Sequence, residues 1–164
     1  MNEINKLAII GRAEKVDLPS LKLTKIPAKT DTGADSSSIW VSKATKDGDD
    51  LLVVFFGPKS QYYSGEIFRF KKNNFSQTIV ANSFGHREFR YKIKLPVKVN
   101  GKFIKATFTL SDRKNKTYPI LLGRRMLSGK FLVDVKSGSP LKLAEKAQSQ
   151  KFKSLVKDRK EKKG

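Results

Sequence analysis

The residues best suited to chemistry in this chain lie in the polar segment 28–38, which contains the triplet Asp31-Thr32-Gly33. Gly33 lets the backbone turn tightly behind the acid, and the hydroxyl of Thr32 can bond to neighbouring backbone groups. The segment therefore predicts a rigid turn that presents Asp31 as a general acid or base. A solvated turn with no chemical role is the alternative, because Asp-Thr-Gly is a common turn sequence.

A second segment favours the catalytic interpretation. An apolar run at 120–122 ends in Gly123-Arg124. This pair of segments resembles aspartic peptidases of the retroviral type, in which a late apolar strand ending in Gly-Arg or Gly-Asn packs behind an early Asp-Thr-Gly-Ala loop. Those enzymes carry a flexible hairpin flap between the two segments, and residues 82–90 hold the matching place here.

Residues 10–137 as a whole resemble a bacterial and archaeal family known as ATP-dependent zinc proteases, which is similar to retropepsins. The motifs that carry the resemblance are Gly11-Arg12-x-Glu14, Leu18-Pro19, Ala28-Lys29-x-Asp31-Thr32-Gly33-Ala34-x-Ser36-Ser37, Ser83-x-Gly85-His86-Arg87-Glu88-x-Arg90-Tyr91, Leu110-Ser111-Asp112-Arg113, Leu121-Leu122-Gly123-Arg124 and Val133-Asp134. The sequence departs from the family pattern at Asp35, where a basic residue is usual, and at Trp40, where His is common. The resemblance implies a retropepsin-like aspartic peptidase. Some members are associated with ligases that add glutamates to a ribosomal protein, which implies trimming of such oligoglutamate tails.

The resemblance also assigns roles to single residues. It implies catalysis by Asp31 within the loop that Thr32 and Gly33 complete. The substrate-binding positions that it implies are Ala34, Ser83, Gly85, Arg87, Arg90, Arg113 and Arg124. Guanidinium groups hold carboxylates in a bidentate manner, which suits an acidic, glutamate-rich peptide. For Arg113 and Arg124 the alternative is a structural role, in which they pair with Asp112 or Asp134 and brace the barrel.

An aspartic mechanism needs two carboxylates that share one proton. The chain has a single Asp-Thr-Gly and is too short for a two-lobed, pepsin-like enzyme. We therefore expect a homodimer in which a two-fold axis supplies the second Asp31. We expect no cofactor and no metal, because one His and no Cys leave only carboxylate-rich zinc sites.

Composition and charge bear on where the protein is found and on what it binds. The chain has 164 residues, no cysteine and a formal net charge of +20. No apolar run approaches the roughly 20 residues that span a membrane, and no secretory signal is visible, so we expect a cytoplasmic protein. The charge attracts acidic peptides or nucleic acid. A non-catalytic basic β-barrel that binds RNA or ribosomes is therefore the alternative function, although no aromatic stacking motif supports it.

The pattern of β-branched and aromatic residues predicts an all-β fold: a closed, retropepsin-like (acid protease) β-barrel with one short C-terminal helix and a basic tail. Asn100-Gly101 predicts a type I′ hairpin turn, and the short helix is expected at 124–127. Strands are expected at 7–10, 25–30, 39–41, 51–56, 66–70, 78–82, 89–99, 102–110, 120–122 and 131–135.

The last part of the chain differs in composition from the rest. Residues 141–164 contain nine Lys or Arg and three acids, with weak helical spacing of apolar residues. We expect the barrel to occupy residues 1–140 and the basic tail, helical or disordered, to occupy 141–164. The tail is either a solvated segment or an arm that contacts the ribosome or RNA.

Overall fold

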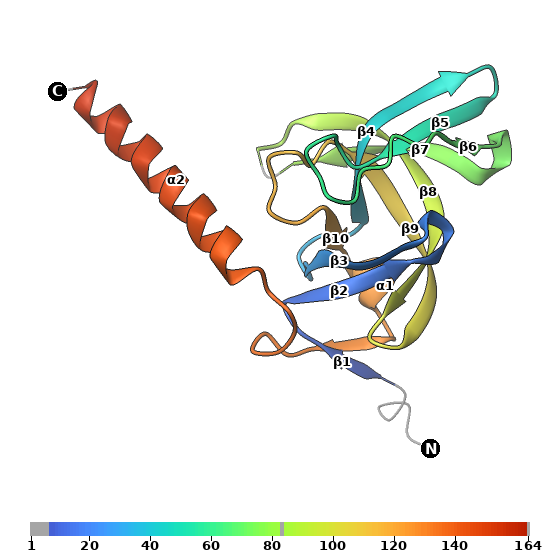
Figure 1. Ribbon diagram of the computed structural model, residues 1–164, viewed down its shortest axis with the longest axis horizontal. Coiled ribbons are helices and arrows are strands. Elements are labelled where there is room, and N and C mark those ends of the chain that lie inside the picture. Colours follow the sequence, from blue (N-terminus) through green and yellow to red (C-terminus); the bar gives the residue numbers. More distant parts are fainter. Residues whose placement is uncertain (1–6, 83, 164) are drawn as a thin grey trace.

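Six strands close on themselves in the order β10, β3, β2, β8, β9, β4 and back to β10 (Figure 1). The computed structural model describes residues 7–82 and 84–163. The barrel strands are β2 (Ala13–Leu18), β3 (Leu23–Thr30), β4 (Ser37–Asp47), β8 (Arg87–Val99), β9 (Lys102–Ser111) and β10 (Ile120–Leu122). The predicted closed β-barrel is confirmed.

The remaining elements lie outside the six barrel strands. They are β1 (Ala8–Ile10), β5 (Asp50–Phe55), β6 (Phe68–Phe70), β7 (Phe75–Ala81), β11 (Phe131–Val133), two 3₁₀ turns at Pro19–Leu21 and Lys72–Asn74, and the helices α1 (Arg124–Leu127) and α2 (Lys142–Glu161). The short helix expected after Gly123 is therefore present as α1. The pairing of β7 with β8 forms a long hairpin at the position expected for a flap.

Alternation of apolar and polar residues builds β8 and the hairpin that follows it. Ile93, Leu95 and Val97 are buried on one face of the strand, while Lys92, Lys94 and Lys98 lie on the other. The turn from β8 to β9 has positive φ at both Asn100 (45°) and Gly101 (80°). This geometry fits the predicted type I′ turn, which needs residues that tolerate left-handed backbone.

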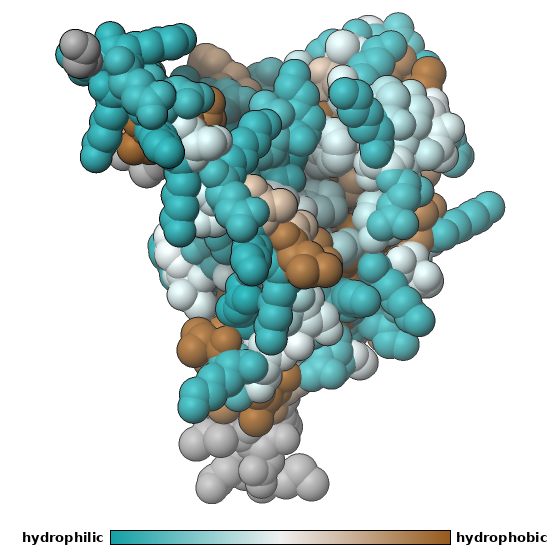
Figure 2. All heavy atoms as spheres, turned by 60° about the vertical axis from the view of Figure 1, so that its left-hand side comes forward, coloured by the Kyte–Doolittle hydropathy of each residue, from teal (hydrophilic) through white to brown (hydrophobic). Residues whose placement is uncertain are grey.

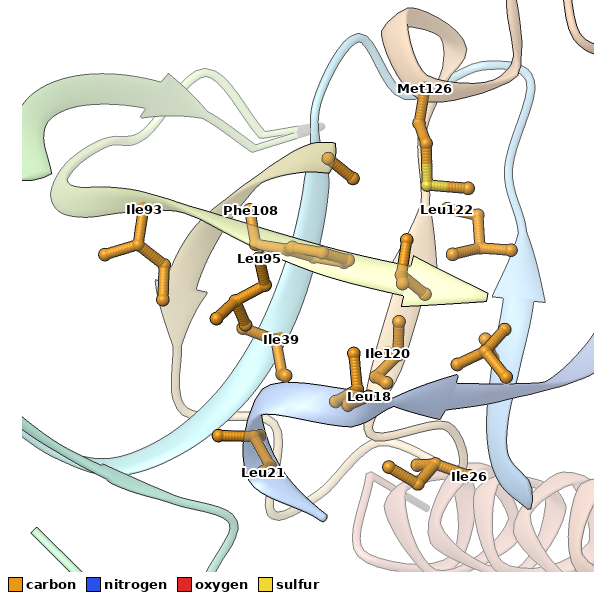
Figure 3. Packing of buried hydrophobic residues seen from close by; sticks show 14 of the residues in the cluster. Leu18, Leu21, Ile26, Ile39, Ile93, Leu95, Phe108, Ile120, Leu122 and Met126 are labelled. Atoms are coloured by element: carbon orange, nitrogen blue, oxygen red, sulfur yellow. The ribbon is translucent and has the colours of Figure 1, made fainter. Parts of the chain in front are cut away.

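The barrel is filled by large aliphatic and aromatic side chains from every strand (Figure 3). Leu18, Ile39, Phe108 and Ile120 are almost completely buried. Each such side chain contributes roughly 1.5–3 kcal/mol through removal of apolar surface from water. This core fixes the two segments that carry the candidate chemistry, because β3 and β10 pair in parallel from Ala28↔Ile120 to Thr30↔Leu122.

Strand β2 was not among the strands expected from the sequence. Three of its six residues are charged, so the segment does not stand out as rich in β-branched and aromatic residues. Its buried residues are Ala13, Val16 and Leu18, and pairing with both β3 and β8 makes it a strand. Tertiary pairing overrides local propensity here.

Helix α2 projects away from the barrel and has no buried residue (Figure 1). Its first turns are anchored by Glu145, which accepts hydrogen bonds from Arg12 (2.8 Å) and from the Tyr118 hydroxyl (2.6 Å). The Leu141 N–H donates to the same hydroxyl at 2.8 Å. The basic tail thus contains a long helix; the boundary at residue 140 remains a prediction.

Anchoring of α2 is expected to depend on pH. The Arg12 hydrogen bond holds the pKa of Glu145 below its usual 4.5, and Tyr118 acts in the same direction. A depressed pKa means that the contact stabilises the folded protein above about pH 4.5 and is lost as pH falls through the lowered value. As the pH is lowered from 4.5, we expect the Leu141 amide to lose its hydrogen-exchange protection at a higher pH than the amides of β8 do. Glu145→Gln should remove this pH dependence; equal loss of protection in α2 and β8 would contradict it.

Candidate active site

Asp31 lies at the end of β3, in a loop held by the adjacent strand β10. Its N–H donates to the Leu122 carbonyl at 2.9 Å. Its Oδ1 accepts hydrogen bonds from the N–H groups of Gly33 (3.0 Å) and Ala34 (3.2 Å). Within the described part of the chain, no donor reaches the second carboxylate oxygen. The loop therefore fixes the carboxylate and leaves one oxygen for a substrate, a water or a second acid.

Gly123 explains why the strand behind the loop ends in Gly-Arg. A Cβ at this position would lie 2.4 Å from the carbonyl carbon of Ser36, so only glycine fits. The Gly123 N–H donates to Ser37 Oγ at 2.9 Å, and the Arg124 N–H donates to the Ala34 carbonyl at 2.7 Å. The end of β10 is thereby packed directly against the Asp31 loop.

Arg124 contacts the Asp31 loop itself. Its Nη1 donates to the Gly33 carbonyl at 2.9 Å, and its guanidinium lies 3.7 Å from Asp35. Asp35 also pairs with Arg125 at 3.1 Å. The acid that departs from the family pattern thus joins the loop to α1.

The alternative in which Arg113 or Arg124 pairs with Asp112 or Asp134 is wrong. Asp112 lies 3.4 Å from the Lys114 ammonium, and Asp134 accepts from the Ser137 hydroxyl at 2.5 Å. The side chains of these acids point to turn residues near them in sequence. Arg124 instead contacts the Asp31 loop, and Arg113 donates to the Tyr118 carbonyl and to Ser38 Oγ.

Arg113 lies close to Asp31 in a largely buried position. Its Nε donates to the Tyr118 carbonyl (2.9 Å) and its Nη1 to Ser38 Oγ (3.1 Å). Burial, together with the nearby Arg90 guanidinium, lowers the pKa of Arg113 to about 10, while Asp31 acts in the opposite direction. Arg113 therefore remains charged at neutral pH and places a cation beside the catalytic candidate.

Arg90 carries a buried donor that lacks a hydrogen-bond partner. Its Nη2 lies 3.2 Å from Glu88, but its Nε is buried and unbonded among the described residues. A buried unpaired donor is costly, by about 1–3 kcal/mol. Because this Nε is closed to solvent, Arg90 can meet a ligand only through its Nη atoms.

A cleft of about 970 Å³ runs from the Asp31 loop along β7 and β9. Its walls include Gly33, Ala34 and the β7 backbone of the hairpin. Six basic side chains line it, against one acid, Asp35: Arg90, Lys92, Lys105, Arg113, Arg125 and Lys130. Low-dielectric walls with one sign of charge concentrate anionic ligands.

The structure brings together some of the predicted site residues and not others. Ala34, Arg90 and Arg113 line the cleft beside the Asp31 loop. Gly85 and Arg87 lie at the tip of the β7–β8 hairpin, where neither lines the cleft. Gly85 adopts φ +79° in this tight turn. Ser83 lies outside the described residues.

Four cleft cations were absent from the prediction: Lys92, Lys105, Arg125 and Lys130. The sequence carries no signal that separates them from the other basic residues, since only barrel closure brings β8, β9 and α1 to one cleft. No cluster of three or more His, Cys, Asp or Glu suited to a metal occurs in the described part of the chain. Nor is any helix there long and apolar enough to cross a membrane.

A closed barrel, an Asp-Thr-Gly loop and a glycine-ended strand behind it define a retropepsin-like protein. The model of the RimB-like family, described as retropepsin-like aspartic endopeptidase RimB, matches residues 9–139. The chain belongs to this family. The name ATP-dependent zinc protease, to which the motifs were compared, is not supported.

Curated proteins and a solved structure are also similar to this chain. Proteins named probable alpha-L-glutamate ligase from Desulfotalea psychrophila and Shewanella pealeana are each 30% identical over 129 residues, covering 77% of this chain and 28% of theirs. The chain thus spans little more than a quarter of these relatives. A Legionella pneumophila protein of unknown function has a crystal structure that aligns with TM-score 0.58 and 26% identity, covering 80% of this chain and 95% of that one.

Proposed function

We propose that this chain is an aspartic peptidase that acts as a homodimer on an acidic, glutamate-rich peptide and trims oligoglutamate tails from a ribosome-associated protein in the cytoplasm. The observation that carries the proposal is the Asp31 carboxylate, oriented through one oxygen by the N–H groups of Gly33 and Ala34, two residues that line a cleft rich in cations. The family match supports peptidase chemistry.

The mechanism requires a second carboxylate, which a symmetric copy of Asp31 would supply. The ionised acid takes a proton from a water, whose oxygen bonds to the scissile carbonyl carbon. The protonated acid polarises that carbonyl by donating to its oxygen. Collapse of the tetrahedral intermediate breaks the C–N bond, and the amine leaves with a proton. The described residues of one chain contain one Asp-Thr-Gly loop, so the homodimer is part of the proposal.

The acidic substrate follows from the charges in the cleft. Six basic side chains against Asp35 would attract a peptide that carries a negative charge on each residue. Arg90 and Arg113 both line the cleft and are near enough to interact electrostatically, and guanidinium groups hold carboxylates well. The names of the curated relatives, probable alpha-L-glutamate ligases, support a link between this barrel and glutamate.

Arg90→Gln is expected to lower kcat/KM for an oligo-α-glutamate peptide about tenfold or more, because a charge-assisted hydrogen bond to a carboxylate contributes about 1.5–3 kcal/mol. Cleavage of the matching oligoglutamine peptide, measured by mass spectrometry, should change much less. Lys94→Gln is the matched control, because Lys94 is exposed on the same strand outside the cleft. Equal losses for both peptides would contradict a carboxylate-reading role for Arg90.

Mass spectrometry of an oligo-α-glutamate peptide incubated with the protein, with and without EDTA, tests the proposed activity. We expect internal or terminal cleavage that EDTA does not change. Absence of cleavage would favour the alternative function, a non-catalytic basic barrel that binds RNA or ribosomes, which the net charge of +20 supports. Steep salt dependence of RNA binding would then be the signature.

A further inference from the structure

A second hollow, a groove of about 810 Å³, lies between α2 and the barrel. One wall comes from the face of α2 that carries Gln148, Phe152 and Val156. Figure 1 shows α2 leaving the barrel at an angle, and Figure 2 shows it at the upper left of a largely hydrophilic face. The family match covers residues 9–139, and α2 therefore lies outside it.

The groove and the Asp31 cleft meet at one residue. Arg113 lines both hollows. Its guanidinium is held there by the Tyr118 carbonyl and Ser38 Oγ. Lys29, which lies two positions before Asp31 on β3, lines the groove. The two hollows are therefore neighbours, with the Arg113 side chain between them.

The groove has the charge to hold an acidic chain. Its basic side chains are Arg12, Lys29, Arg113, Lys116 and Lys153. Its one acid, Glu145, is already engaged by Arg12 and Tyr118. An acidic polypeptide suits these cations better than a segment of a second copy of this chain, in which 35 Lys and Arg outnumber 15 Asp and Glu.

The apolar part of the groove favours a polypeptide over a nucleic acid. Phe152 and Val156 are more than half exposed on the wall that α2 provides (59% and 56%). The methylene stems of glutamate side chains can pack there while their carboxylates reach the surrounding cations. From Glu145 to Val156 the helix rises about 17 Å, which matches about five residues of extended peptide.

We propose that the groove under α2 is an extension of the substrate cleft and binds acidic residues of the same polypeptide beyond the cleaved bond. The inference rests on the proposed function of the Asp31 cleft. With this groove, α2 would make the protein bind long acidic tails more tightly than short ones. A short peptide occupies the cleft only, whereas a long one also reaches the groove. Charged contacts of this kind each change affinity by a few-fold.

The experiment measures binding of fluorescently labelled four- and ten-residue α-glutamate peptides by anisotropy. The protein carries Asp31→Asn, so that binding is read without cleavage. In this background, Lys116→Glu with Lys153→Glu alters the groove. Lys151→Glu is the matched control, because two residues along a helix correspond to a rotation of about 200° and place Lys151 on the opposite face. Light scattering monitors the oligomeric state of each variant.

We expect the groove variant to weaken binding of the ten-residue peptide about three- to tenfold, with little change for the four-residue peptide and for Lys151→Glu. Equal weakening by Lys151→Glu, or no weakening at all, would overturn the inference. A variant that changes the oligomeric state would assign the groove to a second copy instead. If a ten-nucleotide RNA binds more tightly than the ten-residue peptide, and the groove variant weakens RNA binding while Lys151→Glu does not, the groove would be assigned to RNA. If the unsubstituted protein does not cleave the peptide, the proposed function is overturned. The binding assay still shows whether the groove holds an acidic peptide, because it does not depend on cleavage.

Discussion

Asp31→Asn is expected to abolish cleavage of an oligo-α-glutamate peptide, with kcat/KM lowered by about 10³-fold or more. Asparagine cannot exchange the proton on which the two-carboxylate mechanism depends, and general acid–base catalysis contributes about 10²–10⁴-fold. The fold should persist, because the asparagine carbonyl can accept the same hydrogen bonds from Gly33 and Ala34. Quantitative mass spectrometry gives the rate, and circular dichroism with thermal melting checks the fold.

Mixing the unsubstituted protein with the Asp31→Asn variant tests the homodimer. If one active site needs Asp31 from both copies and the copies exchange, an equal mixture retains about a quarter of the activity of the same total amount of unsubstituted protein. Independent sites in single chains would retain about half. Retention of half, or full activity in Asp31→Asn itself, would contradict the shared-acid mechanism.

Gly123→Ala is expected to destabilise the protein by about 3 kcal/mol, the largest stability effect that we foresee for a single methyl group near the site. The new Cβ would lie 2.4 Å from the Ser36 carbonyl carbon and 2.9 Å from the Ser37 nitrogen. Both contacts are with backbone where the Asp31 loop joins β4, so neither side can move without disturbing β4 or β10. Urea denaturation measures the change.

The matched control for this prediction is Gly129→Ala. Gly129 has φ +71° and open space around its Cβ position, so the substitution has only a conformational cost, about 1 kcal/mol. Any Gly123→Ala protein that remains folded should also lose activity, because β10 orients Asp31 through the Leu122 carbonyl. Similar destabilisation by the two substitutions would contradict the close approach of β10 to the loop.

The sequence was sufficient to predict the features that depend on local backbone chemistry. Asp-Thr-Gly predicted the loop, since hydrogen bonds from Gly33 and the following residue to Asp31 span only a few positions. Asn100-Gly101 predicted the hairpin turn for the same reason, because its requirement for positive φ is met by the two residues themselves. Alternation along β8 predicted which of its residues face the core.

Only the tertiary structure decided which further cations line the cleft beside the Asp31 loop. Lys92 comes from β8, Lys105 from β9 and Arg125 from α1, and closure of the barrel brings all three to one cleft. The anchoring of α2 by Arg12 joins residues 133 positions apart. In a chain so rich in Lys and Arg, composition does not distinguish a cleft cation from a solvated one. That distinction depends on long-range strand pairing, which places some charges in a low-dielectric cleft and leaves the others in water.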